Sequence, residues 1–243
     1  MSLAFDYRSN PARDMAFRRV VEGLGAFLHS PEDQPATLPT GSAPLDRLLG
    51  GGLPVGRLVE VVGAQASGKL TLSLKALRAA LERGEPAALV DTTRSVCPPI
   101  ASDPIYEDLL VVRAPDPRLG FQGLDTLLRT GVFTLLVFDL SGLGRPPASA
   151  AVTRLVREAR LAETALLVLS ERRHGPLLGS LASARLSVAP LACARALEVT
   201  LEKSKLGPSG ASVEVPLAHP LSLISPFPAK ETDHDPTRRR RGA

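Results

Sequence analysis

The chain has 243 residues, of which 44% are hydrophobic and 22% are charged, a composition that suits one α/β domain with short extensions. Two cysteines are too few for a disulfide framework or a metal cluster, and the absence of a long apolar run and of a secretory signal favours a cytoplasmic protein without a membrane span. The net charge of +4 equals that of the four C-terminal arginines, so the rest of the chain sums to about zero and indicates no broad basic surface.

Residues 1–35 predict an amphipathic helix followed by a polar linker. Asn10-Pro11 is typical of a helix start, because proline is favoured at the first helical position. Apolar residues then recur at helical spacing, at Phe17, Val20, Val21, Leu24 and Leu28. We interpret this stripe as an interface that docks onto a neighbouring molecule. Packing of the same helix on its own domain is the equal alternative.

Residues 36–224 are predicted to form the folded core, whose centre is the stretch GRLVEVVGAQASGKLTLSL at 56–74. An apolar strand at 58–62 enters a loop bounded by Gly63 and Gly68, and Lys69 then leads into a helix. Strand, loop and helix in this order match the phosphate-binding loop GxxxxGK(S/T), in which backbone N–H groups and a helix N-terminus face one anion. The stretch therefore predicts a nucleotide site.

One position of this loop departs from the pattern. Leu70 stands where the pattern has the hydroxyl that binds Mg²⁺, and Thr71 comes one residue later. The candidate nucleotide-binding residues of this degenerate loop are Gly63, Ser67, Gly68, Lys69 and Thr71. The architecture is kept, but we expect its metal chemistry to be damaged.

The remaining segments alternate in the manner of an α/β domain. Apolar strands are expected at 87–90, 109–112, 132–138 and 165–169, with helices at 123–129 and 148–162 between them. Segments 184–188, 197–201 and 212–215 predict antiparallel strands at one edge. The Pro-rich, charged stretch 225–243 predicts a disordered basic tail.

The segment before the phosphate loop carries a family resemblance. TGSAPLDRLLGGGLPVGRLVEVVG closely resembles the start of the RecA/RadA/KaiC core, TGS-x-x-LD-x-x-LG-GGLP-x-G-R-x-x-E-x-x-G. The resemblance implies a RecA-like P-loop core, in which a mostly parallel sheet is flanked by helices and phosphates bind at the carboxyl ends of the strands. Periodicity alone indicates only an α/β domain.

The resemblance also implies two catalytic positions. Asp139, which follows the strand TLLVF, matches the aspartate that holds Mg²⁺ through water. A neighbouring strand of RecA-like ATPases ends in an acidic residue that orients the attacking water, and Thr93 stands at that position here. Loss of such a base costs roughly 10²–10⁴-fold. Leu70 and Thr93 together predict a pseudo-ATPase with weak or absent binding of ATP and Mg²⁺, with Glu107 as a less favoured replacement base.

Two further resemblances leave alternatives open. Residues 103–106 repeat the tetrapeptide whose tyrosine stacks on adenine in RecA, which points to Tyr106, whereas counting without a gap from Asp91 places Ile100 at that position. Lys203 and Lys205 match paired lysines through which one RecA protomer touches the nucleotide of its neighbour. A solvent-facing strand pattern explains them equally well, because alternate residues share a face.

Contact with nucleic acid is expected to be weak and independent of sequence. Arg172 and Arg173 follow the strand 165–169, where RecA-like proteins begin a DNA-binding loop, and an ordinary solvated loop is the favoured alternative. Four consecutive arginines at the C-terminus add up to roughly four phosphate contacts; they are Arg238, Arg239, Arg240 and Arg241. A solubilising tail is the alternative.

Taken together, these features resemble the ImuA family, the RecA-related accessory proteins of bacterial mutagenic translesion synthesis. Membership implies a non-catalytic role in SOS-type DNA repair beside an ImuB-like protein and a replicative-type polymerase. RecA, a second copy of the chain, and single- or double-stranded DNA are further expected partners. An active DNA-dependent ATPase of the RecA recombinase family and a SulA-type cell-division inhibitor are the alternatives.

Overall fold

The computed structural model describes residues 35–93, 104–141, 148–171, 178–191 and 195–217. Several predicted features lie outside these ranges, namely the stripe from Phe17 to Leu28, Ile100, Arg172, Arg173 and the arginines at 238–241. Among the described residues, no helix combines the length and the apolar character needed to cross a membrane.

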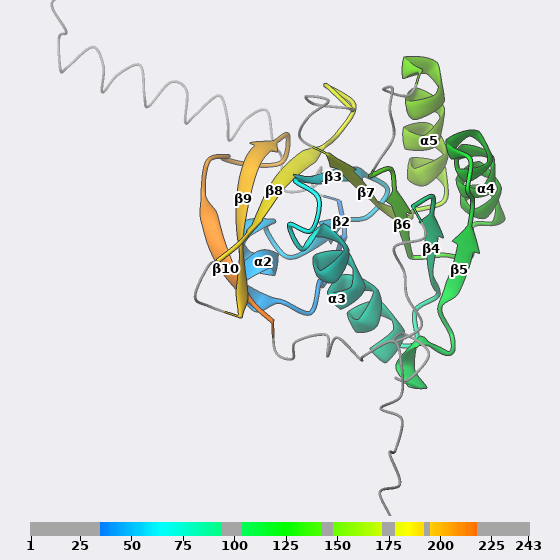
Figure 1. The fold of residues 1–243 in the computed structure, drawn as a ribbon. Helices are drawn as coiled ribbons and strands as arrows, with labels where there is room; N and C mark the ends of the chain where they lie inside the picture. Colours follow the sequence, from blue (N-terminus) through cyan, green and yellow to red (C-terminus); the bar gives the residue numbers. More distant parts are fainter. Residues whose placement is uncertain (1–34, 94–103, 142–147, 172–177, 192–194, 218–243) are drawn as a thin grey trace, which may run out of the picture.

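An eight-stranded sheet forms the centre of the fold, in the order β10-β9-β8-β3-β7-β6-β4-β5 (Figure 1). Neighbouring strands from β8 to β5 are parallel, and β9 and β10 are antiparallel. The predicted α/β class with a mostly parallel sheet is confirmed. The strands are β3 (Leu58–Gly63), β4 (Ala87–Asp91), β5 (Leu110–Arg113), β6 (Leu135–Asp139), β7 (Ala165–Glu171), β8 (Ala184–Pro190), β9 (Ala196–Ser204) and β10 (Ser212–Pro216).

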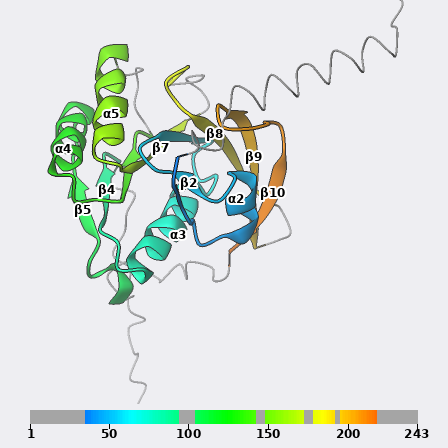
Figure 2. The same ribbon diagram turned by 180° about the vertical axis from the view of Figure 1, so that it is seen from behind.

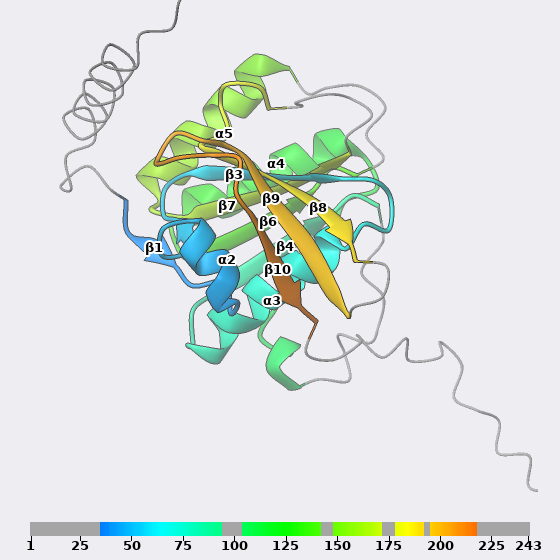
Figure 3. The same ribbon diagram turned by 90° about the vertical axis from the view of Figure 1, so that its left-hand side faces the viewer.

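Helices cover both faces of the sheet. α2 (Ala43–Leu48) and α3 (Lys69–Glu82) lie on one face, and α4 (Pro117–Thr130) and α5 (Ser149–Leu161) lie on the other. Figure 3 shows the layers edge-on, and Figure 2 shows the same arrangement from behind. Smaller elements are the two-stranded sheet of β1 (Thr37–Leu38) and β2 (Leu53–Pro54) and the turn η3 (Pro104–Tyr106).

Burial follows from this layering. Every residue of β3, β4 and β6 is buried, because helices cover both faces of these strands. In β9, by contrast, Leu197, Val199 and Leu201 are buried, whereas Glu198 between them and Glu202 after them are exposed. This period of two indicates that only one face of β9 is covered. Of the four residues predicted to face inward on α5, Val152, Leu155 and Ala159 are buried, and Val156 packs partly buried beside them.

Two sequence predictions need correction. The segment 184–188 was expected to be purely antiparallel, but β8 pairs parallel with β3 and antiparallel with β9, because it joins the parallel sheet to the antiparallel edge. The helix expected at 123–129 is α4, which begins at Pro117. The side chain of Asp116 caps it by accepting a hydrogen bond from the backbone N–H of Arg118 at 2.8 Å, a start signal that periodicity alone does not include.

The family segment TGSAPLD has a structural role in this fold. The carboxylate of Asp46 accepts hydrogen bonds from the backbone N–H of Thr40 at 2.8 Å and from its hydroxyl at 2.7 Å. Between them Gly41 has φ +74°, and a Cβ at this position would lie 2.9 Å from Cβ of Ala79 on α3. The segment therefore packs closely against α3, the helix that carries the phosphate loop at its start.

Candidate nucleotide-binding pocket

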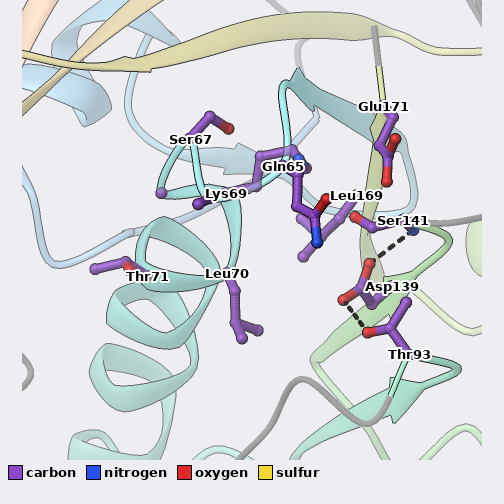
Figure 4. Close-up of a pocket in the computed structure, with 12 residues that line it drawn as sticks. Gln65, Ser67, Lys69, Leu70, Thr71, Thr93, Asp139, Ser141, Leu169 and Glu171 are labelled. Atoms are coloured by element: carbon purple, nitrogen blue, oxygen red, sulfur yellow. Dashed lines mark hydrogen bonds between the residues drawn. The ribbon is translucent and has the colours of Figure 1, made fainter. Parts of the chain in front are cut away.

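A cavity of about 560 Å³ lies where α3 begins and where β6 and β7 end. Its volume falls within the roughly 300–1,000 Å³ of small-molecule sites. Figure 4 shows its lining, with the phosphate loop on one side and the ends of the strands on the other. The lining residues are Gln65, Ala66, Ser67, Gly68, Lys69, Leu70, Thr71, Thr93, Asp139, Ser141, Leu169 and Glu171.

The phosphate loop has the backbone shape of an anion-binding turn. Ala66 has φ +58° and Gly68 has φ +93°, so left-handed residues alternate with ordinary ones just before α3. Glycine is favoured at position 68, because φ +93° is a conformation that residues with side chains rarely adopt, and a Cβ there would also force Cδ2 of Leu197 on β9 to move. Such a loop directs successive backbone N–H groups toward one point, next to the N-terminus of a 14-residue helix.

Lys69 is held by the loop itself. Its buried ammonium donates to the carbonyl oxygens of Gly63 at 3.0 Å and Ala64 at 2.7 Å. Burial lowers the pKa of Lys69 below its usual value, and the carboxylates of Asp139 and Glu171 oppose this shift. Both acids line the same cavity as Lys69. The positive charge is available to an anion that replaces the two carbonyl acceptors.

The carboxylate of Asp139 lies within hydrogen-bond distance of two uncharged donors. Oδ1 accepts from the backbone N–H of Ser141 at 2.8 Å, and Oδ2 lies 3.1 Å from the hydroxyl of Thr93 (Figure 4). The same hydroxyl lies 3.1 Å from Oδ1 of Asp91, so its single proton serves one of the two buried carboxylates at a time. Thr93 thus bridges the ends of β4 and β6 where a catalytic acid was expected from the resemblance.

The lining does not fit the Mg²⁺ ion that the family pattern implies. Leu70 has no hydroxyl, and its side chain packs partly buried against the apolar core. Thr71 does not replace it, because its side chain points away from Asp139 (Figure 4). Mg²⁺ requires an octahedron of oxygen ligands. In the described ranges, no three His, Cys, Asp or Glu side chains are grouped so that they could hold a metal.

The structure places three polar residues in the lining that were not predicted as site residues. Gln65 lies in the phosphate loop, Ser141 follows β6, and Glu171 ends β7. Glu171 is the most informative of these residues about the site, because its carboxylate lies at the carboxyl end of a parallel strand, where open α/β sheets bind their ligands. Its position two residues after the predicted strand 165–169 was the available signal.

Five residues named from the sequence lie outside the cavity lining. One is Gly63, whose carbonyl accepts from Lys69. Tyr106 donates its hydroxyl to the carbonyl of Leu74 on α3 at 3.4 Å, and Glu107 next to it is exposed. The Lys203 ammonium donates to the carbonyl oxygens of Gly179 at 3.0 Å and Ala182 at 3.1 Å, within its own chain, whereas Lys205 is exposed. Burial and the neighbouring cations of Lys205 and Arg185 lower the pKa of Lys203.

Comparisons with known proteins show which proteins this chain resembles. The profile of the RecA N-terminal domain matches residues 22–167. Protein RecA of Lactobacillus johnsonii is 37% identical over 142 residues, which are 53% of this chain and 38% of that protein. Protein RecA of Sulfurovum sp. is 33% identical over 186 residues, which are 71% of this chain and 53% of that protein. The chain thus spans between about a third and about half of the length of these relatives.

A solved structure agrees with this assignment at the level of the fold. The crystal structure of the RadB recombinase matches with a TM-score of 0.61 and 23% sequence identity, and the match covers 73% of this chain and 94% of that one. The sequence profile covers more than half of the chain. The chain therefore belongs to the RecA N-terminal domain family.

Proposed function

We propose that the chain is a non-catalytic accessory protein of DNA repair, of the ImuA type, that acts in translesion synthesis during the SOS response. It works through contacts with an ImuB-like protein and a replicative-type polymerase at damaged DNA, with RecA and further copies of itself as additional partners. The relatives named RecA and RadB recombinase support the assignment to DNA recombination and repair. The accessory role rests on the chemistry of the pocket.

One observation carries the proposal. The cavity keeps its phosphate loop and Lys69, but the side chains at two positions lack the metal ligand and the base that hydrolysis requires. Leu70 provides no metal ligand, and Thr93 provides a hydroxyl, without useful basicity, that bonds to Asp139. A pocket of this kind supports binding and assembly rather than turnover.

Docking through the N-terminal stripe gives a testable expectation. Burying two or three apolar side chains contributes roughly 1.5–3 kcal/mol each before association costs. Val21→Asp with Leu24→Asp should therefore weaken self-association or binding to the ImuB-like protein by at least about tenfold, with an unchanged melting temperature. Sedimentation and thermal melting of the full chain measure both, with Arg18→Asp in the same segment as the control. Unchanged assembly with a lowered melting temperature would rule out the docking role.

Contact with DNA should depend on the C-terminal arginines. Deleting Arg238 to Arg241 removes up to roughly four phosphate contacts, so the slope of log affinity against log salt should become less steep by up to about 3–4. Fluorescence anisotropy with single- and double-stranded oligonucleotides over a salt series measures this slope. Arg172→Ala with Arg173→Ala provides the comparison. If the deletion changes neither affinity nor slope, the tail is not the DNA contact.

The accessory role is tested by recovering the chain from DNA-damaged cells. We expect an ImuB-like protein and a replicative-type polymerase to co-purify with it, and purified ImuB-like protein to bind it directly. Loss of both associations in the Val21→Asp, Leu24→Asp variant would tie the partners to the predicted interface. Failure of the purified proteins to associate at micromolar concentrations would contradict the proposal.

An active DNA-dependent ATPase is the second candidate, and one observation favours it. Glu171 lines the same cavity as Lys69 and opposes the lowering of the pKa of that ammonium, so a carboxylate is present although Thr93 replaces the expected one. A general base at this position would make turnover depend on Glu171. Release of phosphate that Glu171→Gln abolishes would support the ATPase, whereas no release from either protein supports the accessory role.

A further inference from the structure

We propose that the pocket binds a nucleoside diphosphate without Mg²⁺, and that it binds the corresponding triphosphate more weakly. The inference rests on the proposed non-catalytic function and names the ligand of the same cavity. Three features carry it: an intact cradle for phosphate, a lining that does not accommodate the metal, and carboxylates on the far side of the cavity.

The cradle for the phosphate is complete in this chain. Ala66 and Gly68 give the loop its left-handed turns, and α3 begins at Lys69 with N–H groups that have no acceptor within the helix. Ser67 also lines the cavity, but its hydroxyl packs against Gly63 at the end of β3, so Ser67 contributes its backbone to the cradle.

Lys69 completes this cradle. Its ammonium rests on two carbonyl oxygens of the loop, at Gly63 and Ala64, both of which are neutral acceptors. A charged phosphate oxygen is a stronger acceptor for an ammonium than a carbonyl is. Phosphate binding therefore requires only that the Lys69 ammonium exchange its carbonyl acceptors for a phosphate oxygen, without a change in the backbone of the loop.

The cavity offers Mg²⁺ no binding site comparable to the cradle for phosphate. A divalent cation beside Asp139 would find no hydroxyl ligand at position 70 and would compete with the hydrogen bonds from Ser141 and Thr93. Mg²⁺ gives up its water shell reluctantly and needs several oxygen ligands in an octahedron. The gain in affinity that metal coordination gives in ordinary phosphate loops is therefore missing.

The length of the phosphate chain then decides affinity. In a phosphate loop the backbone cradles the α- and β-phosphates, so a γ-phosphate extends beyond it. Here the cavity beyond the loop is lined by the carboxylates of Asp139 and Glu171. Without a cation between them, the γ-phosphate and these carboxylates repel each other. A diphosphate uses the whole cradle and avoids this repulsion.

Calorimetry of the full-length chain tests the proposal with ADP, ATP and inorganic pyrophosphate, each in EDTA and in excess Mg²⁺. We expect the Kd for ADP to change less than about threefold when Mg²⁺ is added, and ATP in EDTA to bind about tenfold more weakly than ADP, which is the order of a screened charge repulsion. Tighter binding of ADP than of pyrophosphate would show that the nucleoside is recognised.

Three variants give the test its specificity. Lys69→Ala should lose ADP binding, and Glu171→Gln should reduce the difference between ATP and ADP. Lys75→Ala is the matched control, because Lys75 lies on the same helix outside the cavity and its ammonium contacts the carbonyl of Pro216. Circular dichroism of each variant checks that the core is folded.

The proposal is overturned if Mg²⁺ strengthens ADP binding tenfold or more, if ATP or pyrophosphate binds more tightly than ADP, or if the folded chain binds no ADP. Loss of ADP binding in Lys75→Ala but not in Lys69→Ala would also overturn it. None of these outcomes involves hydrolysis, so the proposed accessory function would stand. Conversely, steady release of phosphate would overturn the proposed function whatever the affinities are.

Discussion

Glu60→Ala is expected to lower the free energy of unfolding by about 3–5 kcal/mol. Glu60 lies in the middle of β3 with no exposed surface. Its Oε2 accepts from Nε of Arg185 at 2.8 Å, and its Oε1 accepts from the hydroxyl of Ser170 at 3.0 Å. Removing the carboxylate leaves the Arg185 side chain, which is 14% exposed, without its anionic partner. An uncompensated buried charge is among the most costly defects in a folded protein.

Urea unfolding followed by circular dichroism measures this loss. Glu198→Ala is the control, since Glu198 is an exposed glutamate on β9 and should change stability by less than about 0.5 kcal/mol. Replacing both partners, with Glu60→Met and Arg185→Met, should recover much of the lost stability, because no unpaired charge then remains. A loss below about 1 kcal/mol in Glu60→Ala would contradict the structural role assigned to the pair.

Gly52→Ala is expected to lower the free energy of unfolding by about 2–5 kcal/mol. Gly52 has φ +137°, a conformation that residues with side chains rarely adopt. A Cβ here would overlap the carbonyl oxygen of Leu38 and lie 2.7 Å from its carbonyl carbon. These are backbone atoms of β1, which pairs with β2 directly after Gly52, so neither side can move without breaking the small sheet.

Gly84→Ala separates the two contributions to this loss. Gly84 has φ +72°, and no atom lies within 4 Å of a Cβ placed there. The substitution therefore carries only the backbone cost, about 1–2 kcal/mol. The excess loss in Gly52→Ala over Gly84→Ala, measured in urea, reports the overlap with Leu38 together with the higher backbone cost of φ +137°. Equal losses in the two variants would show that the close approach at Gly52 is not needed for stability.

The fold could be predicted from the sequence because its signals are local. Apolar runs and the segment TGSAPLDRLLGGGLPVGRLVEVVG lead to the RecA-like sheet, and the structure agrees with them. The position of β8 could not be predicted, since pairing with β3 depends on contacts between segments about 125 residues apart. The ion pair of Glu60 with Arg185 was missed for the same reason, because neither residue has a local partner that signals burial.

The candidate site was predictable in its residue types and not in its bonding. Leu70 and Thr93 could be placed by comparison with the family pattern, and both line the cavity. That Thr93 bridges Asp91 and Asp139 follows only from the adjacent ends of β4 and β6. Lys69 was expected to face the phosphates, but its contacts with Gly63 and Ala64 depend on the folded shape of the loop. Glu171 gave a signal only through its place at a strand end.

The most direct measurement is phosphate release by the purified chain with ATP, Mg²⁺ and single-stranded DNA. Leu70 and Thr93 predict turnover no higher than that of the Lys69→Ala variant, with or without DNA. Loss of the general base alone lowers turnover by roughly 10²–10⁴-fold relative to an active enzyme of this family. DNA-stimulated turnover comparable to that of RecA, abolished by Lys69→Ala, would contradict the account.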